Sequence, residues 1–314
     1  MLSVVDSPIA GGVLVTGGCG FIGRAVAKAF ESTGTPVTVV DRQSPLGPTD
    51  VAHVVGDLRD EHVRDEAVAP GTVGIIHLAA ATSVLRSVER PTETYTDNVA
   101  VTQELLELAR IREVSRFLLA STNAVVGDVG TTAITEELPL RPLTPYGATK
   151  AACEMLLSGY AGAYGMATCA LRFSNVYGPG MAHKDSFVAR VMRAALTGST
   201  VRIYGDGTQR RDFVHIDDVV RGVLLDWESG YAGRVIIGSG RSVSVLELVE
   251  TVRRVTGRPV RTEHVAAQRG EMPAVVLDLS HSADVIGYRS AVDLADGLDS
   301  TWQYFGDEVG AVTA

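Results

Sequence analysis

The chain has 314 residues, of which 46% are hydrophobic and 21% charged, the composition of a globular protein large enough to bury a sizeable core. Its formal net charge of -9 argues against nucleic acid as a partner, because such binding needs a clustered Lys and Arg surface. Three cysteines at irregular spacing favour free thiols over a disulfide framework, and we expect no metal site.

In the first half of the chain, short runs rich in β-branched residues alternate with segments of helical periodicity. The first run leads directly into a glycine motif, so it predicts a strand and not a signal peptide. No segment reaches the roughly 20 apolar residues of a membrane span, and we expect a cytoplasmic protein without a membrane partner. The alternation predicts an α/β fold with a doubly wound parallel sheet. The expected strands cover 13–16, 37–41, 52–55, 73–77 and 117–121, and the expected helices cover 21–32 and 95–112.

After about residue 175 the pattern changes, because Gly- and Pro-containing turns at 178–180 and 205–207 divide the chain into shorter elements. This is typical of a smaller C-terminal α/β lobe joined to a main domain. We expect the main domain over 1–174 and the lobe mainly over 175–314, with some segments returning to the main sheet. The expected helices cover 187–197, 217–227 and 245–256, and the expected strands cover 201–204 and 234–237.

A glycine-rich turn follows the first strand and opens the first helix, with the spacing G-x-x-G-x-x-G. Glycines let the backbone approach a pyrophosphate, and the helix N-terminus presents free amides to it. The turn thus predicts a Rossmann dinucleotide-binding domain, although a flexible βα turn alone would look the same. The residues expected to line the pyrophosphate are Gly17, Gly20, Phe21, Ile22 and Gly23.

Asp41 ends the second expected strand, about 20 residues beyond the glycines. A carboxylate at this point accepts hydrogen bonds from the 2′-hydroxyl of the adenine ribose and repels a 2′-phosphate. Arg42 beside it could bind that phosphate, but Asp41 should dominate. We therefore expect NAD rather than NADP as the cofactor.

Tyr146 and Lys150 stand at i and i+4, on one face of an expected helix, in a chain with only three lysines. An ammonium within roughly 4–6 Å of a phenol favours the ionised form, so this pair predicts a tyrosine with a lowered pKa that acts as a base. Thr122 ends the fifth strand, where its hydroxyl could share the substrate's hydrogen bond. Taken alone, Thr122 could equally satisfy local backbone.

These motifs together resemble the extended short-chain dehydrogenase/reductase family, especially its nucleotide-sugar epimerases and dehydratases such as the UDP-glucose 4-epimerases. The match covers most of the chain in order. Its motifs are TGGCGFIG at 16–23, Asp41, GDL at 56–58, HLAA at 77–80, Asn98, STNAVVG at 121–127, PYGATK at 145–150, RFSNVYGPG at 172–180, YGDGTQRRDFVHIDDV at 204–219 and DLS at 278–280.

The resemblance implies a role for each matching residue. Thr122, Tyr146 and Lys150 would act on the sugar, with Tyr146 and Lys150 also contacting the cofactor. The remaining cofactor contacts would come from Arg42, Asp57, Leu58, Leu78, Ala79, Ala80 and Asn98. The nucleotide-sugar contacts in the second lobe would come from Asn175, Phe187, Val188, Tyr204, Arg211 and Arg269.

The implied reaction is inversion at C4 of a nucleotide sugar, a UDP-hexose or UDP-hexuronate, through a transient 4-keto sugar with tightly bound NAD. A dehydratase or a 4-ketoreductase is the alternative, and a non-catalytic NAD-binding module is a remote one. Against a 4,6-dehydratase, Asn123-Ala124 replaces the Asp-Glu that follows the threonine in those relatives. Lys184 could contact a uronate carboxylate, although a solvated loop lysine is the simpler interpretation.

The resemblance also implies a homodimer formed through the helices that begin near Tyr95 and Pro145. Such a contact would bury the outer apolar stripes of these helices, including Leu156 and Leu157.

Overall fold

The computed structural model describes residues 12–45, 49–267 and 272–313, which form two compact units. The first unit contains the chain up to residue 127 together with 139–172 and 220–235. The second contains 128–138, 173–219 and the chain from residue 236 onward. The chain thus enters the second unit at 128–138 and again after residue 172, and segment 220–235 returns to the first.

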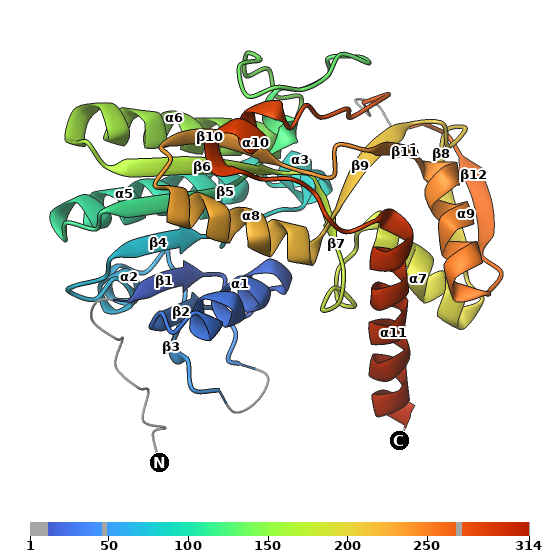
Figure 1. Cartoon of the computed structure of the whole chain (residues 1–314), viewed down its shortest axis with the longest axis horizontal. Helices are drawn as coiled ribbons and strands as arrows, with labels where there is room; N and C mark the ends of the chain where they lie inside the picture. Colours follow the sequence, from blue (N-terminus) through green and yellow to red (C-terminus); the bar gives the residue numbers. More distant parts are fainter. Residues whose placement is uncertain (1–11, 46–48, 268–271, 314) are drawn as a thin grey trace. The chain divides into compact units, whose positions relative to one another are not determined.

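A seven-stranded sheet forms the centre of the fold, in the order β10-β6-β5-β4-β1-β2-β3 (Figure 1). β1 pairs in parallel with β2 and β4, β2 with β3, and β4 with β5, which confirms the doubly wound parallel sheet. The chain reverses its direction of winding between β1 and β4, and ligands of such sheets bind where this happens, at the carboxyl ends of the strands. The strands are β1 Val13–Thr16, β2 Val37–Asp41, β3 Ala52–Val55, β4 Gly74–His77, β5 Arg116–Thr122, β6 Ala167–Phe173 and β10 Gly233–Ile237.

The helices of the first unit agree with the hydrophobic periodicity of the sequence, with one exception. The single helix expected over 95–112 is interrupted by a π-helical turn, η1, between α4 and α5. Turns of this kind are rare and often mark functional sites. The elements are α1 Phe21–Ser32, α2 Glu61–Ala67, α3 Val84–Glu89, α4 Pro91–Tyr95, η1 Thr96–Ala100, α5 Val101–Ile111, the 3-10 turn η2 Asn123–Val125, α6 Pro145–Tyr164 and α8 Ile216–Ser229, of which residues from 220 onward belong to this unit.

The main apolar core lies between the sheet and helices α5 and α6. Leu105, Leu106 and Phe117 are 0% exposed within it, and burial of side chains of this size contributes about 1.5–3 kcal/mol each. Leu157 belongs to this core at 2% exposure, so its expected place on an outer stripe is wrong, and Leu156 packs partly against the same core. The exposed large apolar side chains of α6 are those of Met155, at 62%, and Tyr164, at 57%.

The second unit contains two small sheets and four helices in its described part, and they agree with the expected elements at 187–197, 201–204 and 245–256. β7 pairs in parallel with β9, and β9 pairs antiparallel with β11. Helices α7, α9 and α11 pack against one another (Figure 1). The elements are β7 Asn175–Tyr177, α7 Phe187–Thr197, β8 Thr200–Tyr204, β9 Arg210–His215, β11 Ser242–Ser244, α9 Val245–Thr256, β12 Arg261–Val265, α10 Ser280–Ile286 and α11 Leu294–Thr313.

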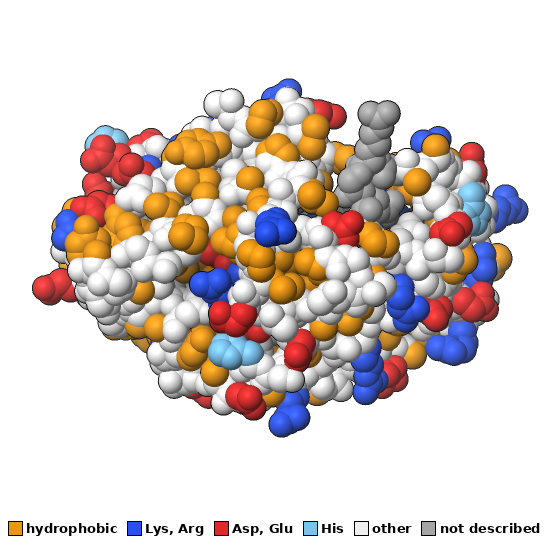
Figure 2. Space-filling view, turned by 90° about the horizontal axis from the view of Figure 1, so that it is seen from above, with side chains coloured by type: hydrophobic (Ala, Val, Ile, Leu, Met, Phe, Trp, Pro, Cys, Tyr) orange, Lys and Arg blue, Asp and Glu red, His pale blue; other side chains and the backbone are white. Residues whose placement is uncertain are grey.

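The surface carries both signs of charge. On the face drawn in Figure 2, the described Lys and Arg side chains are mixed with Asp and Glu and form no single large basic area. Within the described ranges, no helix combines the length and apolar character needed to cross a membrane. The same residues hold no group of three or more His, Cys, Asp or Glu arranged for a metal ion. Cys19, Cys153 and Cys169 are buried free thiols.

Candidate active site

The glycine-rich turn connects β1 to the N-terminus of α1. Gly17 has a φ of +69°, and a Cβ there would lie 2.9 Å from the backbone of Ala79, so only glycine fits. A side chain on Gly23 would overlap the carbonyl oxygen of Gly17. Gly20 caps α1 without a side-chain hydrogen bond, which leaves the first-turn amides of Phe21 and Ile22 available to an anion.

Asp41 lies against this turn, as its position at the end of β2 predicts. Its carboxylate accepts hydrogen bonds from the backbone N–H groups of Cys19 and Gln43, both at 3.0 Å. These contacts hold the carboxylate at the edge of the turn, where a ribose hydroxyl could donate to it. The structure therefore brings the predicted pyrophosphate and ribose contacts together.

The segment Leu78–Ala80 is held at the end of β4 by the side chain of Thr16. Thr16 Oγ1 accepts from the backbone N–H groups of Leu78 and Ala79, both at 3.1 Å, and lies 2.7 Å from His77 Nδ1. Burial, together with the positive charge of Lys150, lowers the pKa of His77 to about 3, so the ring stays neutral. This network fixes the backbone that is expected to line the cofactor.

Asn98 lies on η1 and is 1% exposed. Its Oδ1 accepts from the backbone N–H of Ala81 at 2.7 Å, and its Nδ2 donates to the carbonyl of Ala81 and to Thr149 Oγ1. The amide therefore ties the segment after β4 to α6, one residue before Lys150. The direct contact of Asn98 with the cofactor that the sequence suggested stays a prediction.

The three residues expected to act on the substrate meet at the end of β5 and the start of α6. Helix α6 begins with Thr144 as its N-cap and Pro145 in its first turn, which sets Tyr146 and Lys150 on one face. Thr122, the last residue of β5, hydrogen-bonds to the Tyr146 phenol. Lys150 is 3% exposed and its Nζ donates to the carbonyl of Ala120 at 2.8 Å.

The ionisation of Tyr146 differs from the sequence-based prediction. Burial raises the pKa of its phenol to about 12, and the hydrogen bond from Thr122 offsets this only in part. The lowered pKa that the Tyr–Lys spacing predicted is therefore wrong, and the ammonium of Lys150 donates instead to the carbonyl of Ala120. Desolvation also lowers the pKa of Lys150, while the nearby Glu154 carboxylate raises it.

Next to the expected catalytic residues lies a buried ion pair that motif reasoning missed. The side chains of Glu154 and Arg172 are 5% and 0% exposed, and they meet through Nη2–Oε2 at 2.8 Å and Nε–Oε1 at 3.0 Å. Ser121 Oγ donates to Glu154 Oε1 at 2.5 Å. Glu154 follows Lys150 by one helical turn and Ser121 precedes Thr122, so the Ser121–Glu154 hydrogen bond joins the two elements that carry the expected catalytic groups. An i, i+4 charged neighbour of Lys150 was the available sequence signal.

The described residues of the second unit that are expected to bind the nucleotide sugar lie on β7, α7, β8 and β9. Asn175 on β7 and Arg211 on β9 belong to one three-stranded sheet, and Asn175 is in register with Phe213. Asn175 Nδ2 donates to the carbonyl of Asp212, and Arg211 Nη1 donates to the carbonyls of Arg210 and Met272. Val188 is 2% exposed, so only its backbone could face a ligand. Arg269 lies outside the described residues.

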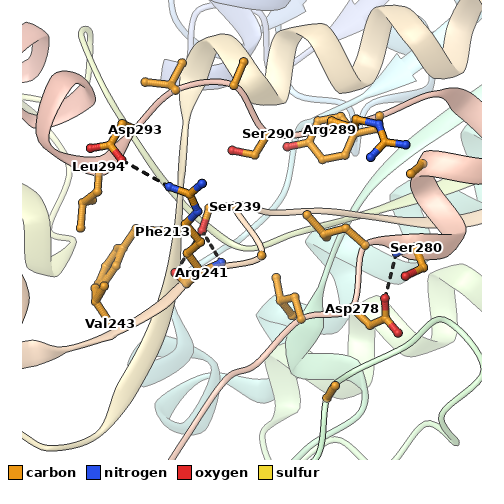
Figure 3. A pocket seen from close by; sticks show the side chains of 18 residues that line it. Phe213, Ser239, Arg241, Val243, Asp278, Ser280, Arg289, Ser290, Asp293 and Leu294 are labelled. Carbon is orange, nitrogen blue, oxygen red and sulfur yellow. Dashed lines mark hydrogen bonds and ion pairs between the residues drawn. The ribbon is translucent and has the colours of Figure 1, made fainter.

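A separate pocket of about 1060 Å³ lies within the second unit (Figure 3). In it Arg241 points toward Asp293, with Nη1 3.4 Å from Oδ2, and Ser239 Oγ accepts from the backbone N–H of Arg241 at 3.1 Å. None of the five described residues expected to bind the nucleotide sugar is among its lining residues.

The fold and the first unit's site together define a dinucleotide-binding α/β enzyme with a Tyr–Lys pair. The sequence model described as "NAD dependent epimerase/dehydratase family" matches residues 13–238, and the chain belongs to this family. NAD is its cofactor. The glycine-rich turn, the N-terminus of α1 and the Asp41 carboxylate fit a dinucleotide.

Relatives with several activities are similar to the chain over nearly its whole length. A UDP-glucose 4-epimerase of Corynebacterium glutamicum is 33% identical, covering 93% of this chain and 95% of that one. A dTDP-glucose 4,6-dehydratase of an Actinoplanes species is 35% identical, covering 93% and 97%. The solved structure of MoeE5 in complex with UDP-glucuronic acid and NAD has a TM-score of 0.89 at 34% identity, covering 95% and 100%.

Proposed function

We propose that the protein is a nucleotide-sugar 4-epimerase that inverts C4 of a UDP-hexose or UDP-hexuronate. The observation that carries this proposal is the intact set of Thr122, Tyr146 and Lys150, with the phenol hydrogen-bonded to Thr122 at the carboxyl end of β5. Reversible oxidation at a hydroxyl-bearing carbon needs a group that moves the hydroxyl proton, a hydrogen bond that holds the oxygen, and a positive charge. Tyr146, Thr122 and Lys150 are proposed to supply these in turn. A non-catalytic module would need neither the phenol nor the ammonium.

Tyr146 is the proposed acid and base. It removes the proton of the C4 hydroxyl and returns it to the 4-keto sugar, while Thr122 holds the same oxygen by a hydrogen bond. NAD, when bound, would supply the hydride acceptor and donor that the oxidation and reduction at C4 require. Because burial raises the pKa of Tyr146 to about 12 despite the hydrogen bond from Thr122, the phenol needs an added positive charge to serve as a base near neutral pH.

Lys150 is proposed to supply part of that charge and to hold the nicotinamide ribose. Its ammonium has three donors, and the structure shows one of them donating to Ala120. The remaining two are proposed to donate to a ribose hydroxyl and to act on the Tyr146 phenol. We further propose that NAD stays bound between turnovers. This predicts that purified protein retains about one NAD per chain after gel filtration.

The second unit is proposed to bind the nucleotide diphosphate through Asn175 and Arg211, with Tyr204 at the base. A guanidinium fits because its fork can bond two phosphate oxygens at once. MoeE5 forms complexes with UDP-glucuronic acid and with UDP-glucose, which supports a UDP-sugar whose C6 is neutral or acidic.

Lys184 favours the acidic sugar as a second candidate. The residue is half-buried and desolvation lowers the pKa of its ammonium, whereas a solvated loop lysine had been the simpler expectation. Among the described ion pairs none involves Lys184, so its charge is available to an anion such as a uronate carboxylate.

A panel of UDP- and dTDP-hexoses with UDP-glucuronate, followed by NMR without added cofactor, tests the proposal. A C4 epimer of unchanged mass supports it and names the sugar. A product lighter by one water would instead place the chain with the dTDP-glucose 4,6-dehydratases. We expect no dehydration, because Asn123-Ala124 offers no acid beside Thr122.

We also propose that the protein is a homodimer formed through α3, α4 and α6 of the first unit. These helices pack together and expose Leu85, Val88, Tyr95 and Met155 at 55–63%. Apolar side chains gathered on neighbouring helices favour association with a second copy. Light scattering at micromolar concentration that gives the mass of one chain would contradict this proposal.

A further inference from the structure

Two aspartates and two arginines form an ionic network beside the expected adenine end of the dinucleotide site. Arg42 Nε lies 3.3 Å from Asp57 Oδ2, and Arg42 Nη2 lies 3.3 Å from Asp97 Oδ2. Arg59 Nη2 lies 2.6 Å from Asp57 Oδ2, and Arg59 Nη1 lies 3.6 Å from Asp97 Oδ1. Both guanidiniums thus contact both carboxylates.

Asp97 is the least exposed member of this network. Its side chain is 8% exposed, whereas those of Arg42 and Arg59 are 56% and 46% exposed. A buried carboxylate is costly unless cations compensate its charge, so moving Arg42 and Arg59 away from Asp97 would cost free energy. Asp97 lies on the π-helical turn η1, which carries it and Asn98 on neighbouring positions.

Asp57 holds the same two arginines from the other side. The hydrogen bond from Arg59, together with the charge of Arg42, lowers the pKa of the Asp57 carboxyl, and Asp57 raises the pKa of Arg59 in return. Arg42 directly follows Asp41, the proposed contact of the adenine ribose. Without the aspartates, an arginine at this place would be well suited to a phosphate on the ribose 2′-oxygen.

We infer that Asp97 is a cofactor-specificity residue, which selects NAD over NADP by engaging Arg42 and Arg59 so that neither cation is free for a 2′-phosphate. Asp41 repels the phosphate directly, and Asp97 removes the groups that would attract it. The inference rests on the proposed place of the ribose at Asp41 and is independent of the sugar and of the reaction.

Nucleotide exchange tests this inference without any turnover. Protein is incubated with an excess of NAD and NADP in equal amounts, separated from free nucleotide, and the bound nucleotides are quantified by chromatography. The variants are Asp41→Ser, Asp97→Asn, their double mutant, and the double mutant with Arg42→Ala. Asp65→Asn is the matched control, because Asp65 pairs with Arg112 at 2.8 Å in the same unit outside this network.

We expect Asp97→Asn alone to change the bound NADP:NAD ratio less than about two-fold, because Asp41 still repels the phosphate. In the Asp41→Ser background it should raise the ratio at least about five-fold, and Arg42→Ala should remove that gain. Asp65→Asn should leave the ratio at the wild-type value. Equal ratios in Asp41→Ser and the double mutant would overturn the inference, as would a gain that survives Arg42→Ala. If Asp41→Ser leaves the NADP:NAD ratio unchanged, the adenine ribose does not lie at Asp41, and the inference is overturned. This outcome is independent of the reaction that the enzyme catalyses.

Discussion

Replacement of Glu154 by Gln tests whether the buried Glu154–Arg172 ion pair stabilises the protein and the arrangement of the proposed catalytic residues. The substitution keeps the shape of the side chain but leaves the guanidinium of Arg172, which is 0% exposed, without its carboxylate. Loss of one partner of a buried pair costs about 3–5 kcal/mol, a large share of the roughly 5–15 kcal/mol that stabilises a typical domain. Ser121 Oγ also loses its charged acceptor at 2.5 Å. Urea unfolding should show the loss directly.

The same variant should change the pH dependence of turnover. The Glu154 carboxylate raises the pKa of Lys150 against the effect of burial, so its removal lowers that pKa further. The ammonium is then lost at lower pH, and the alkaline limb of the rate profile moves toward neutrality. Glu107→Gln is the control, because Glu107 pairs with Arg110 at 2.7 Å on the neighbouring, solvent-exposed face of α5. If Glu154→Gln destabilises no more than this control and its alkaline limb stays in place, the reasoning is wrong.

Three further predictions concern single residues of the first unit. Tyr146→Phe should lower turnover at least about a hundred-fold while NAD stays bound, since only the proton-transfer group is lost; near-wild-type turnover would refute its role. His77, with its pKa near 3 against 6.5 when unfolded, should make the protein lose stability as the pH falls from 6.5, because only the unfolded chain takes up the proton. The loss should be about 1.4 kcal/mol for each pH unit below 6.5, and urea midpoints that stay flat between pH 7 and 5 would contradict it. Gly23→Ala should weaken NAD retention, because the new Cβ overlaps the Gly17 carbonyl; full retention would show that the turn can adjust.

Local patterns in the sequence were sufficient for the frame of the site. The alternation of apolar runs placed β1, β2 and β3 at the residues where the structure has them, and the periodicity of 21–32 placed α1. The spacing of Gly17, Gly20 and Gly23 predicted a turn that only glycine can make at two of these positions. The i, i+4 spacing of Tyr146 and Lys150 placed both on one helical face. These features depend on neighbours a few residues apart, whose effects the sequence displays directly.

Only the tertiary structure decided which charges meet and which side chains are buried. Arg42 pairs with Asp97, 55 residues away, and Glu154 pairs with Arg172, 18 residues away. Local sequence spacing therefore predicts neither pair. Leu157 faces the core, and the phenol of Tyr146 has a raised rather than a lowered pKa, because packing of β5 against α6 removes water from both. Motif spacing identifies the groups that can do chemistry, but their ionisation depends on desolvation. Desolvation is produced by segments that are distant in the sequence and adjacent only in the folded protein.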